Sequence, residues 1–107
     1  MKKLLKWAAI TLALCGTCHA QLMNGNQLYG WMSTNSGQTV ALAYITGVTD
    51  SASWQPGKMA YCLPPGGNNG QFADVVKKYL ADNPQERHKD APEIIFRALL
   101  RAFPCGG

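Results

Sequence analysis

The first twenty residues have the layout of a secretory signal peptide, which limits how much of the chain is left to fold. Residues 1–6 are basic, and Trp7–Leu14 forms an apolar region of eight residues. Cys18 and Ala20 then supply small residues at the −3 and −1 positions of a cleavage site. The apolar region is too short for a membrane anchor, because a spanning helix needs about 20 apolar residues. Lipidation at Cys15 is a second alternative, which the bulky residue before it disfavours. We therefore expect residues 1–20 to be a cleaved signal peptide.

Cleavage leaves residues 21–107, a length that suits a single exported domain. The chain is 47% apolar and only 15% charged, which excludes a disordered protein. Its 10 Lys and Arg exceed its 6 Asp and Glu mainly because three of the lysines lie in the signal peptide. The remaining domain is nearly balanced in charge and has no basic stripe, so we exclude nucleic acid as a partner. No later segment is long enough to span a membrane, and we expect no membrane association after cleavage.

Two cysteines, Cys62 and Cys105, remain after cleavage. In an oxidising compartment, two cysteines of a small domain are expected to form a disulfide. This bridge would close a loop for which the chain-entropy estimate is roughly 4 kcal/mol of stabilisation. A catalytic cysteine is the alternative, but neither residue is next to a histidine. We therefore predict a structural disulfide between them.

Apolar residues recur with helical spacing in four stretches of the domain. The stretches contain, in order, Leu28, Tyr29, Trp31 and Met32; Val40, Ala41, Tyr44, Ile45 and Val48; Phe72, Val75, Val76, Tyr79 and Leu80; and Ile94, Ile95, Ala98, Leu99, Ala102 and Phe103. No stretch shows the sustained alternation of a strand. The sequence therefore predicts an all-α fold, a small bundle of four to five helices stapled by one disulfide.

Capping residues set the expected ends of these helices. Asn24 or Asn26 can cap the first one. Asn83 and Asp90 are each followed by a proline and, three residues on, by a glutamate, which predicts two further helix starts. Pro104 is expected to end the last helix.

The segment Trp54–Gly70 is the least regular part of the domain, because prolines and glycines are frequent in it. We expect a long loop, held near its middle by Cys62. Gly47 lies on the apolar stripe of the second predicted helix, where glycine costs about 1 kcal/mol relative to alanine. We expect it to permit the close approach of a neighbouring backbone.

No set of residues points to catalysis or to a cofactor. His88, the only histidine after cleavage, lies between Arg87 and Lys89 in a predicted solvated turn. One histidine and a bridged cysteine pair cannot make a zinc site. The serines lack a nucleophile motif, and Gly66–Gly70 lacks the lysine and the preceding strand of a phosphate loop. We predict a protein that is not an enzyme and that holds no cofactor and no metal.

A set of short motifs is distributed along the domain. They are Gly25-Asn26-Gln27-Leu28-Tyr29, Ala43-Tyr44-Ile45-Thr46-Gly47-Val48-Thr49-Asp50, Cys62-Leu63-Pro64, the stretch from Gln71 to Asn83-Pro84, Arg87-His88, Ala98-Leu99 and Ala102-Phe103-Pro104-Cys105. In this order they resemble the motifs of the Rap1a/Tai family of type VI secretion immunity proteins. The resemblance covers nearly all of residues 21–107. It implies a periplasmic helical protein that binds and blocks a peptidoglycan amidase effector. A family pattern that this chain lacks is a second cysteine pair, near Met32 and near the start of the second helix.

The motif residues Tyr44, Gly47 and Val48 are better explained as packing positions than as partner contacts. The irregular loop and the basic turn before the last helix are the candidate surfaces, since binding loops commonly project from rigid scaffolds. The candidate partner-binding residues are Trp54, Lys58, Asn68, Asn69, Arg87 and His88. A homodimer is a further expectation, because so small a bundle leaves apolar surface uncovered.

A periplasmic acid-stress chaperone of the HdeA kind is the alternative function. Such proteins are also small, exported, helical and held by one disulfide. They open at low pH when carboxylates that are ionised in the native state take up protons. With only 6 acidic residues and one remaining histidine, the sequence makes such a switch weak.

Overall fold

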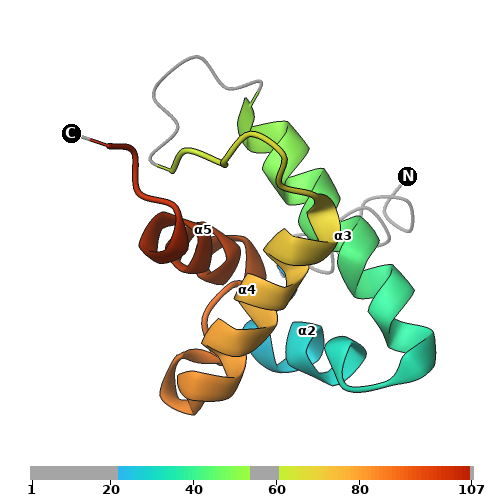
Figure 1. Ribbon diagram of the computed structural model, residues 1–107. Helices are drawn as coiled ribbons and strands as arrows, with labels where there is room; N and C mark the ends of the chain where they lie inside the picture. The colour runs from blue at the N-terminus through green and yellow to red at the C-terminus, as the bar shows by residue number, and fades with distance from the viewer. Residues whose placement is uncertain (1–21, 54–60, 107) are drawn as a thin grey trace, which may run out of the picture.

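The computed structural model describes residues 22–53 and 61–106, which form four α-helices and one 3-10 turn (Figure 1). In chain order these are α2 (Gly25–Met32), α3 (Asn35–Ser53), α4 (Asn69–Asp82), the 3-10 turn η1 (Pro84–Glu86) and α5 (Ala91–Ala102). The described part contains no strand, only isolated bridges between single residues. The predicted all-α bundle is confirmed. The predicted signal peptide lies outside the described residues.

Helix α2 begins at a complete capping box. The Asn24 side chain accepts a hydrogen bond from the Gln27 backbone N–H, and the Gln27 side chain accepts one from the Asn24 N–H, both at 3.0 Å. Of the two predicted caps, Asn24 is therefore the one used. The helix buries Leu28 and Met32 and turns into α3 at Ser33–Thr34.

Helix α3 runs further in both directions than its apolar stripe predicted. It buries Ala41 and Ile45, whereas Val40 is 47% exposed, so the expected burial of Val40 is wrong. The expectation for Gly47 is also wrong: a Cβ added there would meet nothing within 4 Å, so no neighbouring backbone approaches it. Gly47 is instead exposed, on the surface of the helix.

Helix α4 is capped by Asn68, whose side chain accepts a hydrogen bond from the Gln71 N–H at 2.9 Å. The predicted loop is therefore shorter than expected, because Asn69 and Gly70 already belong to the helix. The inner face of α4 buries Phe72, Val76 and Leu80, as the periodicity predicted.

The two predicted caps after α4 do not work as expected. The Asn83 side chain donates to the Tyr79 carbonyl at 2.9 Å and so closes α4, and only the single 3-10 turn η1 follows. Asp90 precedes α5, but its side chain makes no capping hydrogen bond. The start of α5 is instead fixed by the Ala91 N–H, which donates to the Met23 carbonyl at 2.6 Å.

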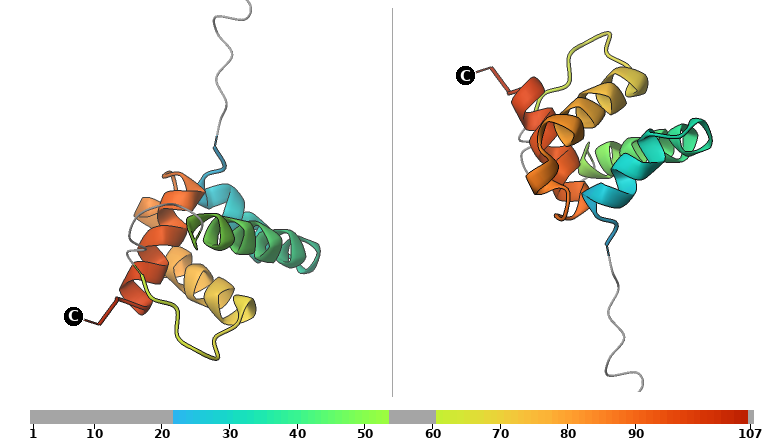
Figure 2. Two further views of the ribbon diagram at one scale, coloured as in Figure 1. Left: turned by 90° about the horizontal axis from the view of Figure 1, so that it is seen from above. Right: turned by 90° about the horizontal axis from the view of Figure 1, so that it is seen from below.

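The helices form two pairs, α2 with α3 and α4 with α5, which meet in one core (Figure 2). Helix α5 buries Ala91, Ile94, Ile95, Ala98 and Leu99, all at most 2% exposed. Ala102, which was expected to be buried, is exposed. None of the described helices is long and apolar enough to cross a membrane.

The predicted disulfide between Cys62 and Cys105 is present, with its Cα atoms 4.8 Å apart. The Cys62 N–H also donates to the Phe103 carbonyl at 2.8 Å, and Tyr61 forms an antiparallel bridge with Pro104. Tyr61 is 2% exposed, and the Phe103 ring packs edge-on against Phe72. The middle of the segment 54–70 and the C-terminal tail are thus fixed to each other and to the core.

Candidate functional site

Asn68 and Asn69 lie at the N-terminal end of α4 and are both exposed. The Asn68 side chain is engaged as the helix cap, as described above. Asn69 is the first residue of the helix, and its side chain makes no hydrogen bond within the described residues. Of the two predicted contact residues here, only Asn69 has a side chain that is not already bonded within the protein.

Arg87 lies in the turn between η1 and α5 and is half-buried. Its guanidinium carbon lies 3.9 Å from the centroid of the Tyr29 ring, and its Nε donates to the Leu80 carbonyl at 2.7 Å. Its own carbonyl accepts from the Asn26 N–H at 2.8 Å. Arg87 therefore joins α2, α4 and the turn, whereas the neighbouring His88 is exposed.

The predicted contact residues do not form one cluster. The two pairs lie at opposite ends of α4: Asn68–Asn69 at its N-terminal end, yellow in Figure 1, and Arg87–His88 near its C-terminal end, orange in Figure 1. A helix of 14 residues is about 20 Å long, so a single small patch does not contain both pairs. The two other candidates, Trp54 and Lys58, lie outside the described residues.

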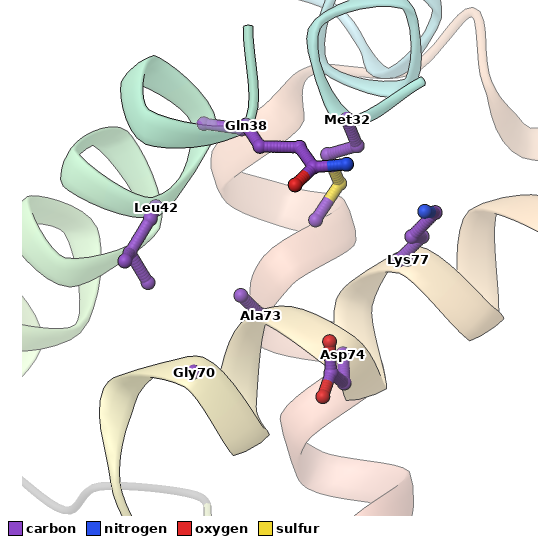
Figure 3. A pocket seen from close by; sticks show the side chains of 8 residues that line it. Met32, Gln38, Leu42, Gly70, Ala73, Asp74 and Lys77 are labelled. Atoms are coloured by element: carbon purple, nitrogen blue, oxygen red, sulfur yellow. The ribbon is translucent and has the colours of Figure 1, made fainter. Parts of the chain in front are cut away.

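A cleft of about 210 Å³ opens between α3 and α4, close to Asn69 (Figure 3). Its floor is apolar, with Met32 and Ala41 almost fully buried. Gln38 reaches in from α3, and Asp74 and Lys77 stand on the α4 wall. The side chains of these three polar residues make no hydrogen bond or ion pair within the described part of the chain. An apolar floor with a few unengaged polar groups is a common form of recognition site.

A second pair of hollows flanks α5. A groove of about 520 Å³ lies between α3 and α5, and Tyr44, Val48, Tyr61 and Phe96 line it. Burial raises the pKa of the Tyr61 phenol; burial and, to a lesser degree, the Asp90 carboxylate raise that of Tyr44. Both phenols are therefore neutral hydrogen-bonding groups at physiological pH.

On the other side of α5, a cleft of about 320 Å³ is polar. Tyr79, Asn83, Glu86, Arg97 and Arg101 are among its lining residues. The hydrogen bond from Lys89, together with the nearby charges of Lys89, Arg97 and His88, lowers the pKa of the Glu86 carboxyl. Glu86 is therefore ionised at neutral pH and paired within the protein.

These arrangements offer surfaces for binding. Within residues 22–53 and 61–106, no three His, Cys, Asp or Glu side chains lie close enough together to hold a metal ion. Both cysteines are joined in the disulfide. A family model for Rap1a immunity proteins matches residues 24–105, from the cap of α2 to the second cysteine. The chain belongs to this family of immunity proteins.

Rap1a proteins are inhibitors that bind a cognate effector, so the surfaces of this chain matter more than any single reactive group. Comparisons with curated proteins and with solved structures gave no match. Within the matched range, Tyr44 and Val48 are half-buried and pack against the core, as expected for packing positions. The Asp50 side chain is exposed, and it makes no hydrogen bond or ion pair within the described residues.

Sequence reasoning about this Rap1a chain missed two surface residues of α5, Phe96 and Leu100. They are 42% and 36% exposed, respectively. A signal for them was present: apolar residues occupy eight of the twelve positions from Ala91 onward when alanines are counted, more than one helix face can bury.

Proposed function

We propose that this chain is a periplasmic immunity protein that binds a peptidoglycan amidase effector of a type VI secretion system and blocks it sterically. Membership of the Rap1a immunity protein family is the observation that carries the proposal. The basic and apolar pattern of residues 1–20 supports export, which would place the protein where cell-wall amidases act.

Inhibition is proposed to work by occlusion. Amidases of this kind are expected to use a Cys–His pair in a groove that accepts a peptide stem, and a rigid insert can exclude the substrate without touching the reacting atoms. A preorganised insert loses little conformational entropy on binding. The irregular segment 54–70 is the first candidate for the insert.

The described part of that segment has the rigidity that an insert requires. The Gly67 N–H donates to the Pro64 carbonyl at 3.1 Å, closing a turn in which Gly66 has a φ of 84°. In the four residues 64–67, proline is the second residue and glycine is the third. This is the pattern of a type II turn, in which the third residue needs a positive φ. Pro65 and Gly66 are exposed, while Tyr61 and the disulfide fix the base of the segment.

Trp54 and Lys58 of the same segment, together with Asn68 and Asn69, remain the proposed contacts of the insert. Arg87 and His88 are the proposed second contact. Because Arg87 is engaged within the protein, His88 is the member of that pair whose side chain is better placed to reach a partner.

The test is to send an amidase effector to the periplasm of a sensitive strain, with and without this chain. The amidase encoded next to this gene is the first choice, followed by those of the strain and its close competitors. We expect co-expression to prevent lysis and affinity purification to recover a complex. A version that lacks residues 1–20 is the matched control for compartment, and it should fail to protect.

Lysis with no recoverable complex, across all of these amidases, would contradict the proposal. Protection by the version without residues 1–20 would contradict the periplasmic site of action while leaving the inhibition intact.

A further inference from the structure

The outward face of α5 displays two large apolar side chains that are only partly buried. Phe96 and Leu100 are 42% and 36% exposed, while Ile94, Ile95 and Leu99 of the same helix are at most 1% exposed. Phe96 and Leu100 are four residues apart and therefore lie one above the other on the helix surface. Single exposed apolar residues are ordinary on a protein, but an adjacent pair forms a ridge.

This ridge stands between the two hollows on either side of α5. Phe96 borders the groove of about 520 Å³ with Tyr44 and Val48, and Leu100 borders the polar cleft of about 320 Å³ with Arg101. A partner laid across α5 would therefore find a protruding apolar ridge and a recess on each side. This shape suits the apolar centre of a protein interface.

The charges beside the ridge are complementary to a carboxylate. Arg97 is paired with Glu93 at 2.8 Å, and Glu86 is paired with Lys89. Arg101 has no carboxylate partner within the described residues; its guanidinium lies 5.7 Å from the centroid of the Tyr79 ring. One positive charge is therefore left uncompensated at the edge of the ridge.

The ridge also adjoins the base of the segment proposed to enter the effector. The Tyr61 and Phe96 rings pack edge-on with their centroids 5.8 Å apart, and Tyr61 bridges to Pro104 just after α5. A partner that accommodates the segment 61–68 would therefore come close to the outward face of α5.

We propose that the outward face of α5, formed by Phe96, Leu100 and Arg101, is a docking surface for the effector and takes an acidic segment of that protein. The inference rests on the proposed function. The segment would place an apolar side chain against the ridge and a carboxylate on Arg101. Leu100 and Arg101 border the same polar cleft, so a carboxylate that enters this cleft lies close to the apolar side chain placed against the ridge.

A second copy of this chain fits the surface less well. The carboxylate that α5 presents on this face, Glu93, is already paired with Arg97 in its own helix. A copy would bring a second uncompensated Arg101 to the contact, and the carboxylate at the start of α5 that is unpaired within the described residues, that of Asp90, lies about 16 Å along the helix from Arg101.

The experiment uses the mature chain and an amidase effector whose catalytic cysteine has been replaced, chosen because the wild-type chain binds it. The variants are Phe96→Ala, Leu100→Ala and Arg101→Glu. The matched controls are Val40→Ala, which removes an apolar side chain that is 47% exposed, and Lys78→Glu, which reverses an exposed charge. Neither residue lines any of the three hollows described above.

We expect each α5 variant to weaken binding about tenfold or more at an unchanged melting temperature, and each control to change it less than about twofold. Binding of the wild-type chain, but not of Arg101→Glu, should weaken as salt is raised. Because Phe96 also contacts Tyr61, Phe96→Ala can lower the melting temperature of the protein. In that case the binding affinities of Leu100→Ala and Arg101→Glu test the docking surface.

Three results would overturn the inference, and they are distinguishable. If the wild-type chain binds the effector and the α5 variants bind it with the same affinity, the docking surface alone is refuted. A change in the size of the free protein in those variants, measured by light scattering, would assign the surface to a second copy. Failure of the wild-type chain to bind any amidase effector would refute the proposed function, and the inference with it.

Discussion

At the scale of single residues, Arg87 shows how a side chain that looks like a partner contact can be structural. It stacks on Tyr29 and donates to the Leu80 carbonyl, so it holds together segments far apart in the sequence. We expect Arg87→Ala to lower the free energy of unfolding by about 1–3 kcal/mol. The substitution leaves the half-buried Leu80 carbonyl without its charged donor and the Tyr29 ring without the cation that stacks on it.

Denaturant titration of the mature protein measures this loss. Lys78→Ala is the control, since Lys78 is exposed and makes only a surface ion pair with Asp82. Equal stability of the two variants would show that the contacts of Arg87 contribute nothing. Any loss of effector binding by Arg87→Ala has to be measured under conditions where the variant remains folded.

Glu86 gives the stability of the protein a dependence on pH. Its pKa is lowered in the folded state, first by the hydrogen bond from Lys89 and then by the surrounding positive charges. Because the pKa of Glu86 is lower in the folded state than in the unfolded state, its ionised carboxylate stabilises the fold at pH values above the unfolded-state pKa of about 4.3. The protein loses this stability as the pH falls through the folded-state pKa of Glu86. We therefore expect wild type to be more stable than Glu86→Gln at pH 7 and the two to converge in acid.

Urea titrations of both proteins between pH 7 and pH 3 would follow that difference. Asp74→Asn is a suitable comparison, because Asp74 is exposed and has no ion pair in the described residues. A gap between wild type and Glu86→Gln that does not shrink on acidification would contradict the expectation.

At the scale of the helices, two glycines of α2 should respond in opposite ways to the same substitution. A Cβ at Gly25 would collide with the Ile94 side chain and lie 2.8 Å from the Arg87 carbonyl oxygen, whereas one at Gly30 would meet nothing within 4 Å. We expect Gly25→Ala to cost about 1–3 kcal/mol through overpacking. Gly30→Ala should add about 0.5–1 kcal/mol, because it removes backbone freedom from the unfolded chain.

Thermal or denaturant unfolding would order the three proteins as Gly30→Ala, wild type and Gly25→Ala, from most to least stable. Similar stability of the two variants would mean that α2 and α5 can separate enough to admit a methyl group.

The helices could be predicted from the sequence because apolar residues recur in each of them with a period near 3.6 residues. Local pattern failed where tertiary contacts decide the outcome. Asn83 has the sequence of an N-cap, but its side chain bonds back to α4, and the start of α5 is set by a backbone contact with Met23. Gly47 was read as a close-packing position, and only the placement of the neighbouring helices shows that it is open.

At the scale of the whole molecule, the disulfide is the strongest single constraint on a domain this small. We expect Cys62→Ser to lower the free energy of unfolding by about 2–5 kcal/mol, since it frees the C-terminal tail and the base of the segment 61–68 together. The double variant Cys62→Ser/Cys105→Ser should lose a similar amount, because either change breaks the same bond. Two titratable thiols per mature chain in unreduced protein would contradict the bridge.

The candidate site was less predictable than the fold, for a physical reason. A docking surface consists of residues that the core does not need, and sequence periodicity reports what the core does need. Thus Phe96 and Leu100 read as part of a wide apolar helix, and their exposure follows only from how α5 packs on its neighbours. Asn68 and Arg87 were found by their polarity, yet both side chains are used by the fold itself.

The bridge between Cys62 and Cys105 also divides the molecule into a covalent ring and a linear arm. The ring contains α4, η1 and α5, and the arm contains α2 and α3. A peptidase that cuts the exposed turn at Pro65–Gly66 would open the ring without releasing either piece. In a compartment rich in proteases, one cut at this exposed turn would therefore leave the molecule in one piece.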